Sequence, residues 1–173
     1  MPVTFTLFNK GAFSQGALVF DRDFKDRPEA LENGEPLYRI YTKWRTVELL
    51  QDTAMGPKAL LSGKYEGWLK RSVSLNGFDS HTQAKRTAIL RSGWSFVDFM
   101  SNEFTWRVSG WSTSWTLSDV NGAVVAKLTR ATLHRNKLGT LEIMEDVSES
   151  LQALILVTCK LVHQTIQDGE HSS

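Results

Sequence analysis

An apolar segment near the C-terminus is the feature that most constrains this fold. Residues 151–162 place leucine, isoleucine, valine, alanine and cysteine on every side of a helical wheel. A helix that is apolar on all faces needs protein or lipid around it. The segment is shorter than the roughly 18 residues that span a bilayer, so protein is the expected surrounding. We predict a central helix over residues 148–167, capped by Asp146 or Ser148, and a polar tail over 168–173.

The rest of the chain reads as short strands separated by turn residues. Apolar and polar residues alternate most clearly in 104–108 and 114–118. Many short strands with regular turns are typical of a sandwich or barrel. Residues 21–34 are expected to form a charged surface loop. The expected strands cover residues 3–8, 16–20, 37–41, 46–50, 59–61, 68–75, 87–90, 96–99, 104–108, 114–118, 123–128 and 138–143, with breaks or turns at Gly56–Pro57, Asn76–Gly77 and 119–122.

Short strands followed by one helix that is apolar on every side suggest a particular protein family. Its signals appear in order as Pro36 to Thr42, then Phe104 and Trp106, and a closing helix from Leu151 to Thr158. Between them stand Trp115, Leu117, Asp119, Gly122, Val125 and Ala126, then Leu138 to Ile143. This order resembles the tubby-like superfamily, which includes tubby C-terminal domains, phospholipid scramblases and LURP-one-related proteins. It is most similar to tubby-like proteins of mushroom-forming fungi.

The resemblance implies a single domain over residues 1–173. It implies a mainly β fold, an antiparallel barrel of about twelve strands that encloses a hydrophobic C-terminal α-helix. Basic positions on tubby domains hold phosphoinositide headgroups, so an anionic membrane surface is an expected partner, and a protein partner is the alternative.

Composition and charge narrow the classes of function and the cellular location that can be expected. The chain has 173 residues and a formal net charge of +1, so no global field favours nucleic acid. One cysteine, Cys159, permits no internal disulfide and lies in an apolar run, where a buried inert thiol is expected. The N-terminal residues do not have the pattern of a secretory signal, and no stretch is long and apolar enough to span a membrane. A cytoplasmic location is therefore expected, with peripheral contact to a membrane as an option.

No motif for catalysis, cofactor or metal binding stands out. There is no G-x-S-x-G elbow and no glycine-rich phosphate loop. Asp21, Asp23 and Asp26 have a spacing that a calcium loop could use, but interleaved basic residues favour a solvated loop. The histidines have no zinc spacing, and His163 is expected where the helix leaves the barrel. We expect no metal and no cofactor.

A basic cluster is the best candidate ligand site. Lys127, Arg130, Arg135 and Lys137 lie with His134 on two strands and the turn between them. Lysine and arginine in such a hairpin favour phosphate groups. Lys127 and Arg130 are three apart and should face opposite ways unless a bulge intervenes, so Arg135 and Lys137, two apart, are the expected pair within the cluster.

Six tryptophans complete the set of candidate residues. Trp106 and Trp115 fall on alternating strands and are expected in the core. Trp44, Trp68, Trp94 and Trp111 flank turns, where they could line a pocket, a partner surface or a membrane interface. These features favour a non-enzymatic binding module. The alternatives are a small enzyme that holds an apolar metabolite in an aromatic-lined barrel pocket, and a lipid-moving activity by analogy with scramblases.

Overall fold

A closed antiparallel barrel surrounds the C-terminal helix. The computed structural model describes residues 2–10, 16–87, 93–108, 113–132, 136–144 and 146–171. The strands are β1 (Val3–Asn9), β2 (Gly16–Phe20), β3 (Tyr38–Thr42), β4 (Thr46–Thr53), β5 (Gly56–Glu66), β6 (Ser72–Gly77), β7 (Ser80–Arg86), β8 (Trp94–Val97), β9 (Glu103–Val108), β10 (Ser114–Asp119), β11 (Val124–Arg130) and β12 (Lys137–Ile143). The helices are α1 (Arg27–Asn33) and α2 (Glu149–His171).

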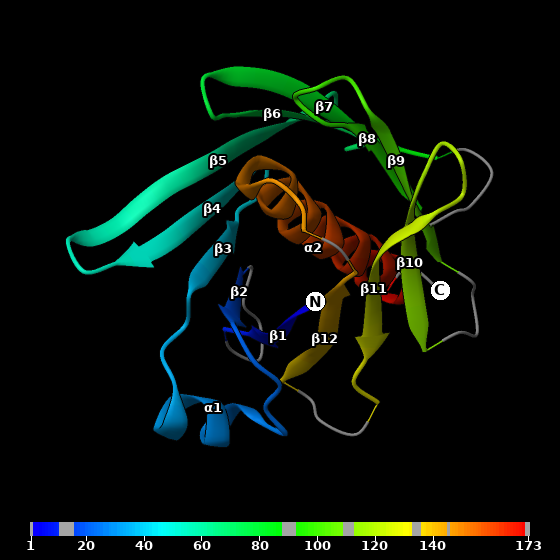
Figure 1. Cartoon of the computed structure of the whole chain (residues 1–173). Helices are drawn as coiled ribbons and strands as arrows, with labels where there is room; N and C mark the ends of the chain where they lie inside the picture. Colours follow the sequence, from blue (N-terminus) through cyan, green and yellow to red (C-terminus); the bar gives the residue numbers. More distant parts are fainter. Residues whose placement is uncertain are drawn as a thin grey trace.

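Strands that follow one another in the chain are paired, and β1 pairs with β12 to close the barrel. The closing register sets Val3 opposite Ile143 and Leu7 opposite Gly139. Figure 1 shows the strands as a ring with α2 running through it. The predicted fold class, a mainly β barrel of about twelve strands around a hydrophobic C-terminal helix, is therefore confirmed.

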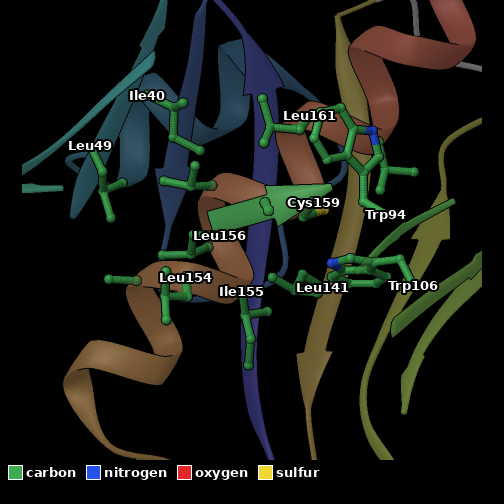
Figure 2. Packing of buried hydrophobic residues seen from close by; sticks show 14 of the residues in the cluster. Ile40, Leu49, Trp94, Trp106, Leu141, Leu154, Ile155, Leu156, Cys159 and Leu161 are labelled. Carbon is green, nitrogen blue, oxygen red and sulfur yellow. The ribbon is translucent and has the colours of Figure 1, made fainter. Parts of the chain in front are cut away.

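The apolar helix supplies the centre of the core. The side chains from Ala153 to Val162 are all buried, and strand residues such as Ile40, Leu49 and Leu141 pack against them (Figure 2). A fully buried leucine contributes about 2 kcal/mol, so this segment is a main source of stability. Ser148 is the N-cap, because its Oγ accepts a hydrogen bond of 3.2 Å from the Leu151 amide.

The helix is longer than predicted and continues past residue 167 to His171, so residues 168–171 of the expected polar tail are helical. Among the described residues, neither helix combines the length and apolar content that a membrane span requires.

The expected surface loop over residues 21–34 was a wrong prediction, because it contains α1. Asp26 caps this helix by accepting a hydrogen bond from the Glu29 amide, and Glu29 accepts one from the Lys25 amide in return. Phe24 and Ala30 then pack on outward-facing Phe8, Leu18 and Phe20. The segment that looked like a solvated loop is a cover over the outer wall of β1 and β2.

Two turn predictions also need correction. The Asn76–Gly77 turn lies two residues further on, because Phe78 and Asp79 adopt positive φ angles of 52° and 54° while Gly77 still pairs with Ser80. Gly77 has a different role: a Cβ there would lie 2.1 Å from the Leu60 carbonyl oxygen. Gly56–Pro57 opens β5 rather than breaking it, and Trp68 lies in the β5–β6 turn rather than in a strand.

Candidate functional site

The two ends of the barrel are distinguished by the direction of α2. Near its start, Gln152 donates a hydrogen bond of 2.8 Å to the Tyr38 hydroxyl at the beginning of β3. Near its end, Thr165 accepts one of 3.0 Å from the Trp94 indole at the beginning of β8. We call the end at which α2 finishes the C-terminal mouth. Its described turn residues are Lys10, 43–45, 67–71, Thr87, Gly93, Thr113, 131–132 and Asn136.

Charge is divided between the two mouths. The described turns of the C-terminal mouth contain Lys10, Lys43, Arg45, Lys70 and Arg71 but no aspartate or glutamate. At the opposite mouth, the hairpin turns at 54–55, 78–79, 98–102 and 120–123 contain Asp79 and Asp98 but no lysine or arginine. These short turns therefore differ in charge, while the exposed carboxylates of Glu66 at the end of β5 and Asp168 at the end of α2 also lie at the C-terminal mouth.

Two turns of the C-terminal mouth carry exposed tryptophans. We call residues 43–45 and 67–71 the tryptophan turns. Trp44 is 75% exposed, Trp68 is 86% exposed and Leu69 is 53% exposed. Large apolar side chains this open to water are unfavourable in isolation and often mark a contact surface.

The tryptophan turns are held side by side by specific contacts. The Arg45 guanidinium donates a hydrogen bond of 3.0 Å to the Gly67 carbonyl, and the Arg45 carbonyl accepts one of 2.9 Å from the Tyr65 amide. The Lys70 ammonium lies 4.3 Å from the centre of the Trp44 ring. Apolar and cationic groups therefore form one continuous surface.

A hollow adjoins this surface on its inner side. It has a volume of about 290 Å³ and lies between the β5–β6 turn and the end of α2, where Trp68, Lys70, Gln164 and Asp168 contribute to its walls. The side-chain amide oxygen (Oε1) of Gln164 is buried there and has no hydrogen-bond partner among the described residues. Asp168 is exposed. The hollow can admit a small polar group but has no buried carboxylate among these wall residues.

Polar residues of α2 are buried below the mouth. Lys160 is 2% exposed and His163 is 6% exposed, which corrects the expectation that His163 leaves the barrel. Burial, together with the positive charges of Lys160 and Arg130, lowers the pKa of His163 to about 3. Burial also lowers the pKa of Lys160 to about 8. At neutral pH His163 is uncharged and Lys160 is mostly protonated.

The predicted basic cluster does not share one surface in its described part. Lys127 points outward from β11, whereas Arg130 points inward with its guanidinium carbon 5.4 Å from the Trp115 ring centre. The opposite directions of Lys127 and Arg130 are as predicted. Lys137 is held by Asp23 at 3.1 Å and by the Phe24 carbonyl at 2.6 Å. Arg135 and His134 lie outside the described residues.

Other predicted residues have ordinary structural roles. Trp106 and Trp115 are fully buried, as predicted, and so is Trp94. Cys159 is buried, and burial raises the pKa of its thiol to about 12, which keeps it protonated and inert. Asp23 binds Lys137 and Asp26 caps α1, so neither is a free calcium ligand. Within the described ranges, no three histidine, cysteine or acidic side chains gather as a metal site requires. Trp111 lies outside the described residues.

Sequence reasoning missed the grouping at the C-terminal mouth. Its visible signals were two short stretches, Lys43-Trp44-Arg45 and Trp68-Leu69-Lys70-Arg71, each mixing tryptophan with cations. The sequence also held Lys160 inside the apolar run, where an ionisable residue is expensive to bury.

Comparison of the chain with family models, with curated proteins and with solved structures finds no match.

Proposed function

We propose that this protein is a non-enzymatic binding module that docks on anionic membrane surfaces through its C-terminal mouth. The observation that carries the proposal is the pair of tryptophan turns, in which exposed Trp44, Trp68 and Leu69 stand among four cationic side chains. This is the binding-module hypothesis from the tubby-like resemblance, with the contact moved from the 127–137 hairpin to the tryptophan turns at the same mouth.

The charge distribution supports the orientation. An anionic leaflet attracts lysine and arginine by about 1 kcal/mol for each residue near the surface. Lys43, Arg45, Lys70 and Arg71 would supply this attraction at one mouth, while Asp79 and Asp98 at the other would be repelled. The barrel is therefore expected to approach with the tryptophan turns first.

The tryptophans support a membrane rather than a rigid protein partner. Indole rings prefer the headgroup region, where one edge is apolar and the N–H meets water. Trp44 and Trp68 belong to turns whose tips project from the strands, so they can enter that region without unfolding the barrel. A protein partner that buries these rings is the competing outcome.

The other readings have weaker support. The 127–137 hairpin has Lys137 already bound to Asp23 and the Phe24 carbonyl, and Arg130 turned toward the barrel interior. An enzyme needs a tuned acid or base facing its substrate, and among its described wall residues the hollow beside α2 has one carboxylate, the exposed Asp168.

Flotation with phosphatidylcholine vesicles that contain increasing phosphatidylserine tests the proposal. Binding is expected to rise with phosphatidylserine and to fall with salt, because surface charges are screened within about 8 Å at physiological ionic strength. Reversal of one cation in Arg71→Glu removes one attraction and adds one repulsion, so binding should weaken by about tenfold or more. Trp44→Ser with Trp68→Ser should weaken it further.

Two matched controls lie at or near the opposite mouth. Lys58→Glu makes the same charge reversal at an exposed site of β5, and Met55→Ser removes a side chain that is 100% exposed. Both should bind like wild type. Equal loss in these controls, or no binding at any phosphatidylserine content, would rule out docking through the C-terminal mouth.

A further inference from the structure

Four side chains inside the C-terminal mouth form what we call the inner basic cluster: Trp115, Arg130, Lys160 and His163. The Trp115 and His163 ring centres are 6.3 Å apart, and the Arg130 guanidinium carbon is 5.4 Å from the Trp115 ring centre. Lys160 and His163 are three residues apart on α2, so they occupy the same side of the helix.

The cluster has hydrogen-bonding groups without partners. The Trp115 indole nitrogen and the His163 Nδ1 are buried and have no partner in the described part of the chain. Lys160 is buried beside them, and its positive charge acts on His163. Groups of this kind cost about 1–3 kcal/mol each when they stay unsatisfied, and more when they are charged.

The group that would satisfy most of these side chains is an acceptor. An indole N–H, an ammonium and a guanidinium can only donate hydrogen bonds, and only the neutral imidazole can also accept. Two of the four groups, Arg130 and Lys160, are cations, and the nearest acidic influence on Lys160 is Asp168 on the same helix. A group that accepts several hydrogen bonds and carries negative charge completes this set.

We infer that the inner basic cluster binds a small oxyanion of the phosphate or carboxylate class. Arg130 is only half-buried, so the anion can enter from the C-terminal mouth and meet the buried donors behind it. The site lies inside the barrel wall and does not depend on membrane docking by the tryptophan turns. Bound there, the anion neutralises the charge that α2 carries into the core.

Thermal unfolding with inorganic phosphate at constant ionic strength and pH 7 tests the inference, with chloride as the reference anion. Wild type should show a melting temperature that rises and saturates with phosphate, because a ligand of the folded state stabilises it. Calorimetric titration should give the same saturable binding, which separates a site from the general stabilising effect of phosphate on proteins.

Three variants identify the site. Lys160→Met should lose the saturable response. Arg130→Gln, at a half-buried position that tolerates change, should weaken it by about tenfold, as expected for one charge-assisted hydrogen bond. Lys127→Met removes a cation from the outer face of the same strand and should respond like wild type. No saturable response in wild type, or an unchanged one in Lys160→Met and Arg130→Gln, would overturn the inference.

Vesicle flotation at saturating phosphate, with chloride at the same ionic strength as the reference, separates two sources of such an anion. Loss of vesicle binding would mean that the inner basic cluster binds the phosphate of a lipid headgroup. Unchanged vesicle binding would mean that it binds a free anion. If phosphate binds but no vesicle does, the inference stands and the proposed membrane docking fails.

Discussion

The Trp106 indole donates a hydrogen bond of 2.9 Å to the Thr158 hydroxyl in the middle of α2, where both side chains are fully buried. Together with the hydrogen bonds of Gln152 and Thr165 at the two ends of α2, this bond fixes the rotation of the helix against the barrel wall. Trp106→Phe should lower the free energy of unfolding by about 2 kcal/mol or more, because a hydrogen bond is lost and a cavity appears. Chemical denaturation measures the change.

A double-mutant cycle with Thr158→Val isolates the hydrogen bond from the loss of volume. The two changes should be coupled by about 1 kcal/mol. Trp115→Phe is the matched control, since the Trp115 nitrogen has no partner among the described residues, and its effect should add to that of Thr158→Val. Additive effects for the Trp106 pair as well would mean that the bond does not hold the helix.

The fold was largely predictable because most strands and the central helix contain regularly spaced apolar residues, which form their buried faces. Residues 104–108 and 114–118 alternate cleanly, and they became β9 and β10. β7 was not predicted, since its sequence is polar and only Thr82 and Ala84 face the core. α1 was mistaken for a loop because its cap Asp26 and its Pro28 also occur in turns.

The candidate site was less predictable because it depends on barrel closure. Trp44 and Trp68 are far apart in the chain, and only the pairing of β4 with β5 brings their turns together. The sequence alone did not show whether these two tryptophans are exposed or packed in the core. The burial of His163 was also missed, because no sequence pattern shows where a central helix reaches the mouth.

The depressed pKa of Lys160 gives a pH-dependent stability. Its pKa is about 8 in the folded state and 10.5 ordinarily, so the unfolded state holds the proton more tightly between these values. Burial of the charge therefore costs most below pH 8, and the cost shrinks as the pH rises toward 10.5. In phosphate-free buffer, Lys160→Met should be more stable than wild type at pH 7 by about 3 kcal/mol.

Denaturant unfolding of both proteins from pH 7 to pH 10 checks this. The advantage of Lys160→Met should narrow steadily above pH 8. Burial raises the pKa of Cys159 and of Tyr65 to about 12, so both also make folding pH-dependent through the unfolded state, but they are present in both proteins and cancel in the difference. A difference that stays constant with pH would show that the Lys160 ammonium is not desolvated.

Lys137 should act as a structural residue. Its ammonium binds the Asp23 carboxylate and the Phe24 carbonyl, and its side chain is only 11% exposed. Lys137→Met should lower the free energy of unfolding by about 1–2 kcal/mol, because these acceptors lose their donor. Lys127→Met, on the outer face of β11, should change it by less than about 0.5 kcal/mol. Similar small effects at both positions would leave Lys137 available for ligands.

Fluorescence quenching by lipids with brominated acyl chains tests the central claim most directly. Trp44 and Trp68 are exposed, whereas Trp94, Trp106 and Trp115 are buried. On phosphatidylserine vesicles, bromine should quench wild-type fluorescence strongly. The variant Trp44→Phe with Trp68→Phe should still bind but lose most of the quenching, because phenylalanine keeps the apolar contact. Bound wild type that is not quenched, or a variant that is quenched equally, would contradict docking through the C-terminal mouth.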